Sequence, residues 1–134
     1  MENFNLILPE IFLSLSIFAT LLIGVFFKNS YNLVTNTTYV IIISSLLIIF
    51  NSFNDSGNLF SNSFVSNSFT NFFKILILLG TLFVMLITQN YIKEMKLNYF
   101  EYPLLLLFSI LGMFFMISSN DLMSFYLGLE LQSL

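Results

Sequence analysis

Five apolar runs, separated by polar segments, most restrict how this chain of 134 residues can fold. They cover approximately residues 6–27, 37–53, 69–87, 103–117 and 122–134. A helix needs about 20 residues to cross the roughly 30 Å hydrocarbon core of a membrane, where it satisfies its own backbone hydrogen bonds. The pattern therefore predicts an all-α, polytopic transmembrane helical bundle. It has four complete spans and a truncated fifth within a single membrane domain fragment.

Composition agrees with a membrane protein and argues against several kinds of chemistry. Hydrophobic residues make up 57% of the chain and charged residues 8%, whereas about a quarter of the residues in soluble domains are charged. Histidine, cysteine and arginine are absent, so no thiolate or imidazole is present to bind zinc, haem or an iron–sulfur cluster. We expect no metal, no bound cofactor and no redox chemistry on this chain. With only four lysines and a net charge of −3, we also expect no nucleic-acid partner, because phosphates need a basic face.

A bias in residue usage indicates the kind of genome that encodes the chain. There is one alanine, Ala19, and no tryptophan, against 18 phenylalanines and many Asn, Ile, Leu and Ser residues. These frequent residues have codons rich in A and T, which is typical of an organelle genome. The acidic, polar N-terminus differs from a basic transit peptide or secretory signal. Synthesis inside an organelle is therefore the expectation.

Lysine positions predict how the spans are oriented. The connections after the first and third apolar runs carry three lysines, which are Lys28, Lys93 and Lys96. Short loops rich in lysine normally face the cytoplasm or matrix. The opposite side should then hold the N-terminus, the polar segment 54–71 and Lys74, which we expect at the mouth of the third span.

Local signals predict helix ends and loops. Pro9 and Glu10 suit a helix's first turn, where an acid interacts favourably with the positive end of the helix dipole. Asn120-Asp121 is expected to cap the last helix. Segment 54–71 is rich in Asn and Ser and is expected to be an extramembrane loop with phenylalanines that dip into the interface or a neighbour. Four glycines allow close helix contacts without GxxxG spacing: Gly24, Gly80, Gly112 and Gly128.

Glu130 is the ionisable residue that the sequence places nearest the membrane midplane. It lies eight residues after Leu122, or about 12 Å along a helix that rises roughly 1.5 Å per residue. An acid at that depth is costly and is functional by default. The alternative is a neutral acid that hydrogen-bonds a neighbouring helix and only holds the bundle together. Because residues 122–134 extend only about 20 Å as a helix, we expect another polypeptide to complete this span.

Three stretches of the chain resemble one known family. The longest is EYPLLLLFSILGMFFMISSNDLMSFYLGLELQSL, residues 101–134, which is similar to helices four and five of the second subunit of NADH:ubiquinone oxidoreductase, respiratory complex I. Leu8-Pro9-Glu10 is similar to its first helix, and residues 64–76 to the start of its third. Many members have Asp where this chain has Asn67. Because three leading helices are present, the chain resembles the longer bacterial, plant and protist form.

The resemblance implies an antiporter-like, proton-pumping subunit in the mitochondrial inner membrane, or alternatively in a bacterial plasma membrane. In that family a glutamate on helix five pairs with a lysine on a broken helix seven, so Glu130 would be a proton relay whose lysine lies outside this chain. The host enzyme would use NADH, FMN, iron–sulfur clusters and ubiquinone on other subunits. Membrane lipids and other membrane-arm subunits would be partners. Two alternatives stay open, namely a subunit of a multisubunit sodium/proton antiporter and a structural membrane subunit without transport chemistry.

Overall fold

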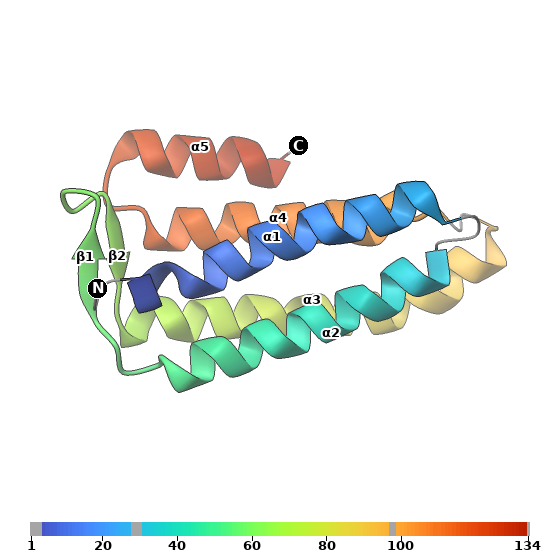
Figure 1. Cartoon of the computed structure of the whole chain (residues 1–134), viewed down its shortest axis with the longest axis horizontal. Coiled ribbons are helices and arrows are strands. Elements are labelled where there is room, and N and C mark those ends of the chain that lie inside the picture. Colours follow the sequence, from blue (N-terminus) through green and yellow to red (C-terminus); the bar gives the residue numbers. More distant parts are fainter. Residues whose placement is uncertain (1–3, 28–30, 97–98, 134) are drawn as a thin grey trace.

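The computed structural model describes residues 4–27, 31–96 and 99–133. In order, its elements are α1 (Phe4–Phe26), α2 (Tyr31–Asn51), β1 (Gly57–Leu59), β2 (Phe64–Ser66), α3 (Ser68–Glu94), α4 (Glu101–Ser118) and α5 (Leu122–Ser133). Helices α1 to α4 lie side by side, and α5 runs along the outside of α4 (Figure 1). By length and composition, α1 to α4 are able to cross a membrane. The predicted polytopic helical bundle is thus confirmed.

The helices extend beyond the apolar runs that predicted them. Helix α2 begins at Tyr31 rather than at residue 37, and α3 continues to Glu94 rather than ending at residue 87. Polar residues continue α2 because their side chains bond within the same helix. The hydroxyl of Thr35 donates to the carbonyl of Tyr31 at 2.8 Å, and Thr38 donates to Val34 at 2.7 Å. Lys28, used to predict orientation, and Leu134 lie outside the described residues.

The core lies between the four long helices, each of which buries one stripe of side chains. Helix α1 buries residues three or four positions apart, as expected for one face of a helix. Fully buried apolar members of the core include Leu13, Ile17, Ile42, Ile49, Leu78, Leu107, Ile110 and Phe114. The outer faces of the same helices carry large exposed apolar side chains, among them Phe18, Val40, Phe83 and Leu105. A bundle with an apolar exterior is suited to lipid rather than to water.

Segment 54–71, predicted to be a loop, instead contains an antiparallel β-hairpin. Strands β1 and β2 pair with Gly57 opposite Ser66, and the three residues Phe60, Ser61 and Asn62 in the turn have positive φ angles. The backbone N–H of Asn120 donates to the Ser63 carbonyl at 3.0 Å, and its side-chain amide donates to the Asn62 carbonyl at 2.9 Å. The α4–α5 turn is distant in sequence from this polar segment, and contacts with that turn hold the segment in place.

Two helix starts near the hairpin are capped by side chains. Asn67 and Thr70 form a reciprocal capping box at the start of α3, with both bonds at 2.9 Å. At the start of α5, the carboxylate of Asp121 accepts a hydrogen bond from the Ser124 N–H at 2.7 Å, which confirms the predicted cap. Pro9, by contrast, lies inside α1 rather than in its first turn. The expectation for Pro9 is wrong because α1 already runs from Phe4. An interior proline removes one backbone hydrogen bond, and burial of Leu6 and Leu13 on either side of Pro9 offsets that cost.

Helices α4 and α5 approach closely at two glycines. A Cβ atom at Gly112 would lie 2.5 Å from the backbone N of Gln132, and one at Gly128 would lie 2.9 Å from the backbone N of Met116. Only a residue without a side chain permits such an approach. The expected close contact is confirmed at this crossing, whereas a Cβ at Gly80 would meet no atom within 4 Å.

Candidate intramembrane charge sites

A buried ion pair joins α1 to α3 inside the bundle. Glu10 is 1% exposed and Lys74 is 0% exposed, and Lys74 Nζ donates to Glu10 Oε1 at 2.5 Å. The ammonium group also lies 5.4 Å from the ring centroid of Phe64 and 5.6 Å from that of Phe114. The negative faces of aromatic rings attract a cation at this distance. The carboxylate and the two rings together replace part of the hydration that Lys74 loses on burial.

The local sequence explains how each member reaches the interior. Glu10 lies on the buried stripe of α1 between Leu6 and Leu13, and Lys74 lies on the buried stripe of α3 between Thr70 and Leu78. Helices α1 and α3 both begin at the hairpin end of the bundle (Figure 1). Each charged residue is six positions after the first residue of its helix, so both lie about 9 Å along it at roughly 1.5 Å per residue.

These positions correct two expectations and add a site that the sequence analysis missed. Glu10 is neither in a first turn nor at a solvated helix end, and Lys74 is not at the mouth of its span. Both expectations placed the charged side chain where water can solvate it. In the structure Glu10 and Lys74 are buried and compensate each other's charge. The sequence did contain a signal, because each charged residue lies inside a predicted apolar run and the two spans start on the same side.

Glu130 has the opposite environment within this chain. It is exposed on α5, where Gly128 is the only buried position among the described residues of the helix. Its neighbours Tyr126, Leu127 and Leu129 are also exposed, and the Tyr126 side chain hydrogen-bonds the Glu130 carboxylate. Glu130 therefore does not point into the α1–α4 bundle. The described residues neither provide nor test the lysine partner, so its role as a proton relay stays a prediction.

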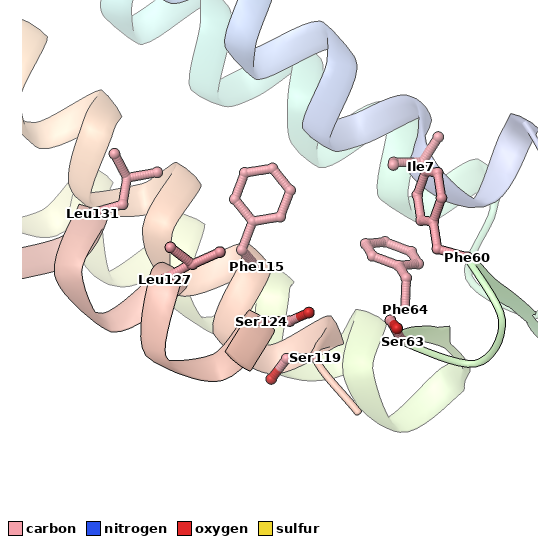
Figure 2. Close-up of a pocket in the computed structure, with 10 residues that line it drawn as sticks. Ile7, Phe60, Ser63, Phe64, Phe115, Ser119, Ser124, Leu127 and Leu131 are labelled. Atoms are coloured by element: carbon pink, nitrogen blue, oxygen red, sulfur yellow. The ribbon is translucent and has the colours of Figure 1, made fainter. Parts of the chain in front are cut away.

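A largely apolar cavity of about 490 Å³ lies at the hairpin end, lined by residues of α1, the hairpin, the α4–α5 segment and α5. Figure 2 shows the hairpin side chains of Phe60, Ser63 and Phe64 on one side of it and Leu127 and Leu131 of α5 on the other. The remaining lining residues are Ile7, Phe115, Ser119, Ser124 and Gly128. Phe64 borders both the cavity and the Glu10–Lys74 ion pair, because its ring lines the cavity and also lies beside the Lys74 ammonium group.

Asp121 carries the charge at the start of α5, outside the membrane-spanning segments. Hydrogen bonds from the backbone and side chain of Ser124, and then from the side chain of Ser63, hold the pKa of this carboxyl below its usual value. Ser63 belongs to the hairpin and Ser124 to α5. Asp121 therefore links the two elements that border the cavity.

Comparisons with known proteins find similarity along the whole chain. A protein of Pelagibacter ubique named NADH-quinone oxidoreductase subunit N is 51% identical over 135 residues, covering 100% of this chain. The subunit N of Bartonella bacilliformis is 41% identical over 130 residues, or 96% of this chain. A subunit N 1 of Rhizobium meliloti is 38% identical over 134 residues, or 98% of this chain. This chain is similar to part of subunit N.

The subunit N relatives are much longer than this chain. The match covers 29%, 26% and 28% of their lengths, respectively. No family model matches the chain. All three subunit N relatives are from bacteria, so they support a bacterial plasma membrane and do not support the mitochondrial inner membrane that the sequence predicted.

Proposed function

We propose that this chain forms the N-terminal part of a membrane-arm subunit of a proton-translocating NADH:quinone oxidoreductase. In this subunit Glu130 contributes to the proton path. The observation that carries the proposal is the 51% identity over the whole chain to a protein named as subunit N of NADH-quinone oxidoreductase. The four apolar helices agree with a place in its membrane part. We assign the subunit to a bacterial plasma membrane, with lipid against its exposed apolar faces.

The exposure of Glu130 supports a role completed by other helices. Its helix contacts α4 through Gly128, while Glu130 and Tyr126 are both exposed. Acids at membrane depth face protein or water rather than hydrocarbon. The chain spans less than a third of the length of its relatives, so the remaining part is long enough to supply helices that cover this face. A lysine there, within about 4 to 6 Å, would stabilise the charged form of a carboxylate.

The redox groups of such an enzyme belong on other polypeptides in this proposal. NADH, FMN, iron–sulfur clusters and ubiquinone are what the family resemblance implies for the complex. This chain contains neither cysteine nor histidine, so its donor set does not fit an iron–sulfur cluster. Its proposed contribution is therefore to hold and pass protons, in contact with other membrane-arm subunits.

The sodium/proton antiporter alternative differs in the complex that the subunit joins. Isolation of the full-length subunit from its native membrane distinguishes them, because the proposal expects co-purification with NADH:quinone reductase activity. Co-purification with cation exchange activity instead would favour the antiporter. A structural subunit without transport chemistry would leave proton translocation unaffected when Glu130 is neutralised.

Substitution of Glu130 by Gln in the full-length subunit, within the assembled complex, tests the relay role. Gln keeps the size and an acceptor for the Tyr126 hydroxyl but cannot titrate. We expect normal assembly and at least a tenfold loss of quinone-reducing turnover coupled to proton translocation. Tyr126→Phe is the matched control, because it removes the same hydrogen bond and keeps the carboxylate. Unchanged proton translocation and turnover in Glu130→Gln would show that the relay role is wrong.

A further inference from the structure

We propose that Glu10 and Lys74 form a second proton-binding site of this chain, which water reaches from the hairpin end when Phe64 moves aside. The site is separate from Glu130 and lies between α1 and α3. Its functional readout rests on the proposed role in proton translocation, whereas its accessibility can be measured independently of that role.

The buried pair has hydrogen-bonding capacity that the described residues do not use. Glu10 Oε2 is buried without a hydrogen-bond partner among them, and so is the hydroxyl oxygen of Ser118. Ser118 is one helical turn from Phe114 on the buried face of α4, and the ring of Phe114 contacts Lys74. Buried polar atoms are normally paired, and a buried water usually bridges two to four of them. The unpaired oxygen atoms therefore mark a place for water beside the ion pair.

Phe64 is the side chain shared by the ion pair and the cavity. It is 6% exposed, its ring centroid is 5.4 Å from Lys74 Nζ, and it also lines the cavity of about 490 Å³. Figure 2 shows its ring beside Ser63, at the hairpin side of the cavity. Rotation of this ring would open the pair toward the cavity without separating any of the four long helices.

The position of Phe64 is linked to the start of α5. Phe64 forms a β-bridge with Ser119, and Asn120 hydrogen-bonds the carbonyls of Asn62 and Ser63. A displacement of the α4–α5 turn would therefore displace the hairpin residues that hold Phe64. Because α5 also carries Glu130, the same turn connects the two charge sites mechanically.

The proton transfer at this site involves water and the carboxylate. A hydronium ion that enters past Phe64 gives its proton to Glu10 Oε2 and becomes water, and Glu10 becomes a neutral acid beside the ammonium group of Lys74. Return of that proton to water restores the ion pair. Glu10 on α1 and Lys74 on α3 are the only charged side chains buried in the part of the chain that the structure describes. The rings of Phe64 on β2 and Phe114 on α4 face Lys74, and neither can titrate.

The double variant Glu10→Gln/Lys74→Met, in the full-length subunit within the complex, separates proton binding from packing. Removal of both charges leaves neither one unpaired, so the bundle is expected to assemble. We expect NADH oxidation with an artificial electron acceptor to be unchanged and protons translocated per NADH to fall at least twofold. The control Lys93→Met/Glu94→Gln makes the same charge changes at exposed positions of α3. Unchanged proton translocation in the assembled Glu10→Gln/Lys74→Met variant would overturn the proposal.

A second measurement tests water access without relying on assembly of that variant or on proton translocation. Residues 1–134 contain no cysteine, so Ser66→Cys introduces the one thiol of this part, at a buried position on the same face of β2 as Phe64. We expect a water-soluble thiol reagent to label it at least tenfold faster when Phe64 is replaced by Ala. Ser61→Cys, exposed in the hairpin turn, is the control and should react equally in both backgrounds. Equal labelling rates of Ser66→Cys with and without the Phe64 ring would overturn the proposal. This outcome does not depend on the proton translocation measured for Glu130→Gln.

Discussion

Glu10 and Glu130 are acids at similar depths from the same end of the molecule, yet their surroundings are opposite. Glu10 lies six residues into α1 and Glu130 eight residues into α5, which corresponds to about 9 and 12 Å of helix at roughly 1.5 Å per residue. Glu10 is enclosed by the bundle and paired with Lys74, whereas Glu130 is exposed on a helix that contacts mainly α4. The first charge is compensated within this chain, and the second requires groups beyond it.

This difference shows that depth alone does not identify the role of a charged residue in a helical bundle. Removal of two charges from water is costly, and their attraction offsets that cost only where the geometry is good. Helices α1 and α3 provide that geometry because the buried stripes of both helices face the core, where Glu10 and Lys74 meet. Helix α5 presents only Gly128 as a buried position, so it leaves Glu130 free for a different neighbour.

The largest effect is expected from breaking the pair at one member. Lys74→Met would leave Glu10 charged, buried and unpaired, which costs about 3 to 5 kcal/mol of folding free energy in comparable cases. We expect a large decrease in the apparent Tm of the full-length subunit purified in detergent. The control Lys93→Met removes an exposed lysine from the same helix. A Lys74→Met subunit as stable as the control would mean that the ion pair does not stabilise the link between α1 and α3 across the core.

A smaller effect is expected at the crossing that attaches α5 to the bundle. In Gly112→Ala the new methyl group would lie 2.5 Å from the Gln132 backbone N, so α5 must shift, at a cost of about 1 to 3 kcal/mol. Gly80→Ala is the matched control, because its Cβ meets nothing within 4 Å and helix propensity favours Ala by about 1 kcal/mol. The two Tm changes should therefore have opposite signs. A decrease of equal size in both variants would contradict the close contact.

A local effect is expected at the start of α5, where Asp121 caps the helix. Asp121→Ala removes the acceptor for the Ser124 N–H, so amide hydrogen exchange should become faster in the first turn of α5 and stay unchanged in α3. The pKa of Asp121 is lower in the folded chain than its ordinary value of 3.8. Its stabilising contribution is therefore complete above that ordinary value and is lost as the pH falls through the lower folded pKa. Asp121→Asn, which can still cap, should show nearly normal exchange. Equal exchange in all three proteins would contradict the cap.

The smallest effect on stability is expected at Glu130. Because Glu130 is exposed in this chain, Glu130→Gln should change the folding free energy of residues 1–134 alone by less than about 0.5 kcal/mol. Circular dichroism melting of that polypeptide in detergent would measure it, with Tyr126→Phe as the control on the same face. A decrease in Tm as large as that of Lys74→Met would remove the contrast between the two acids.

The apolar runs were sufficient to predict the helical bundle, and polar residues at helix starts were sufficient for the Asp121 cap. These features depend on neighbours a few residues apart, so the sequence contains the relevant information. The β-hairpin was not predictable in the same way. Its turn residues Phe60, Ser61 and Asn62 have positive φ angles without any glycine, and its order depends on Asn120, far away in the sequence.

The sequence was enough to predict a chain of long apolar helices, and its resemblance to the second subunit of respiratory complex I made Glu130 the candidate proton relay. Only the folded structure shows that Glu10 meets Lys74, because that contact depends on how the helices are rotated and aligned against each other. Local apolarity sets where a helix is found, and it cannot say which face of that helix meets a given neighbour. A charge within an apolar stripe is stable only when packing brings an opposite charge to it.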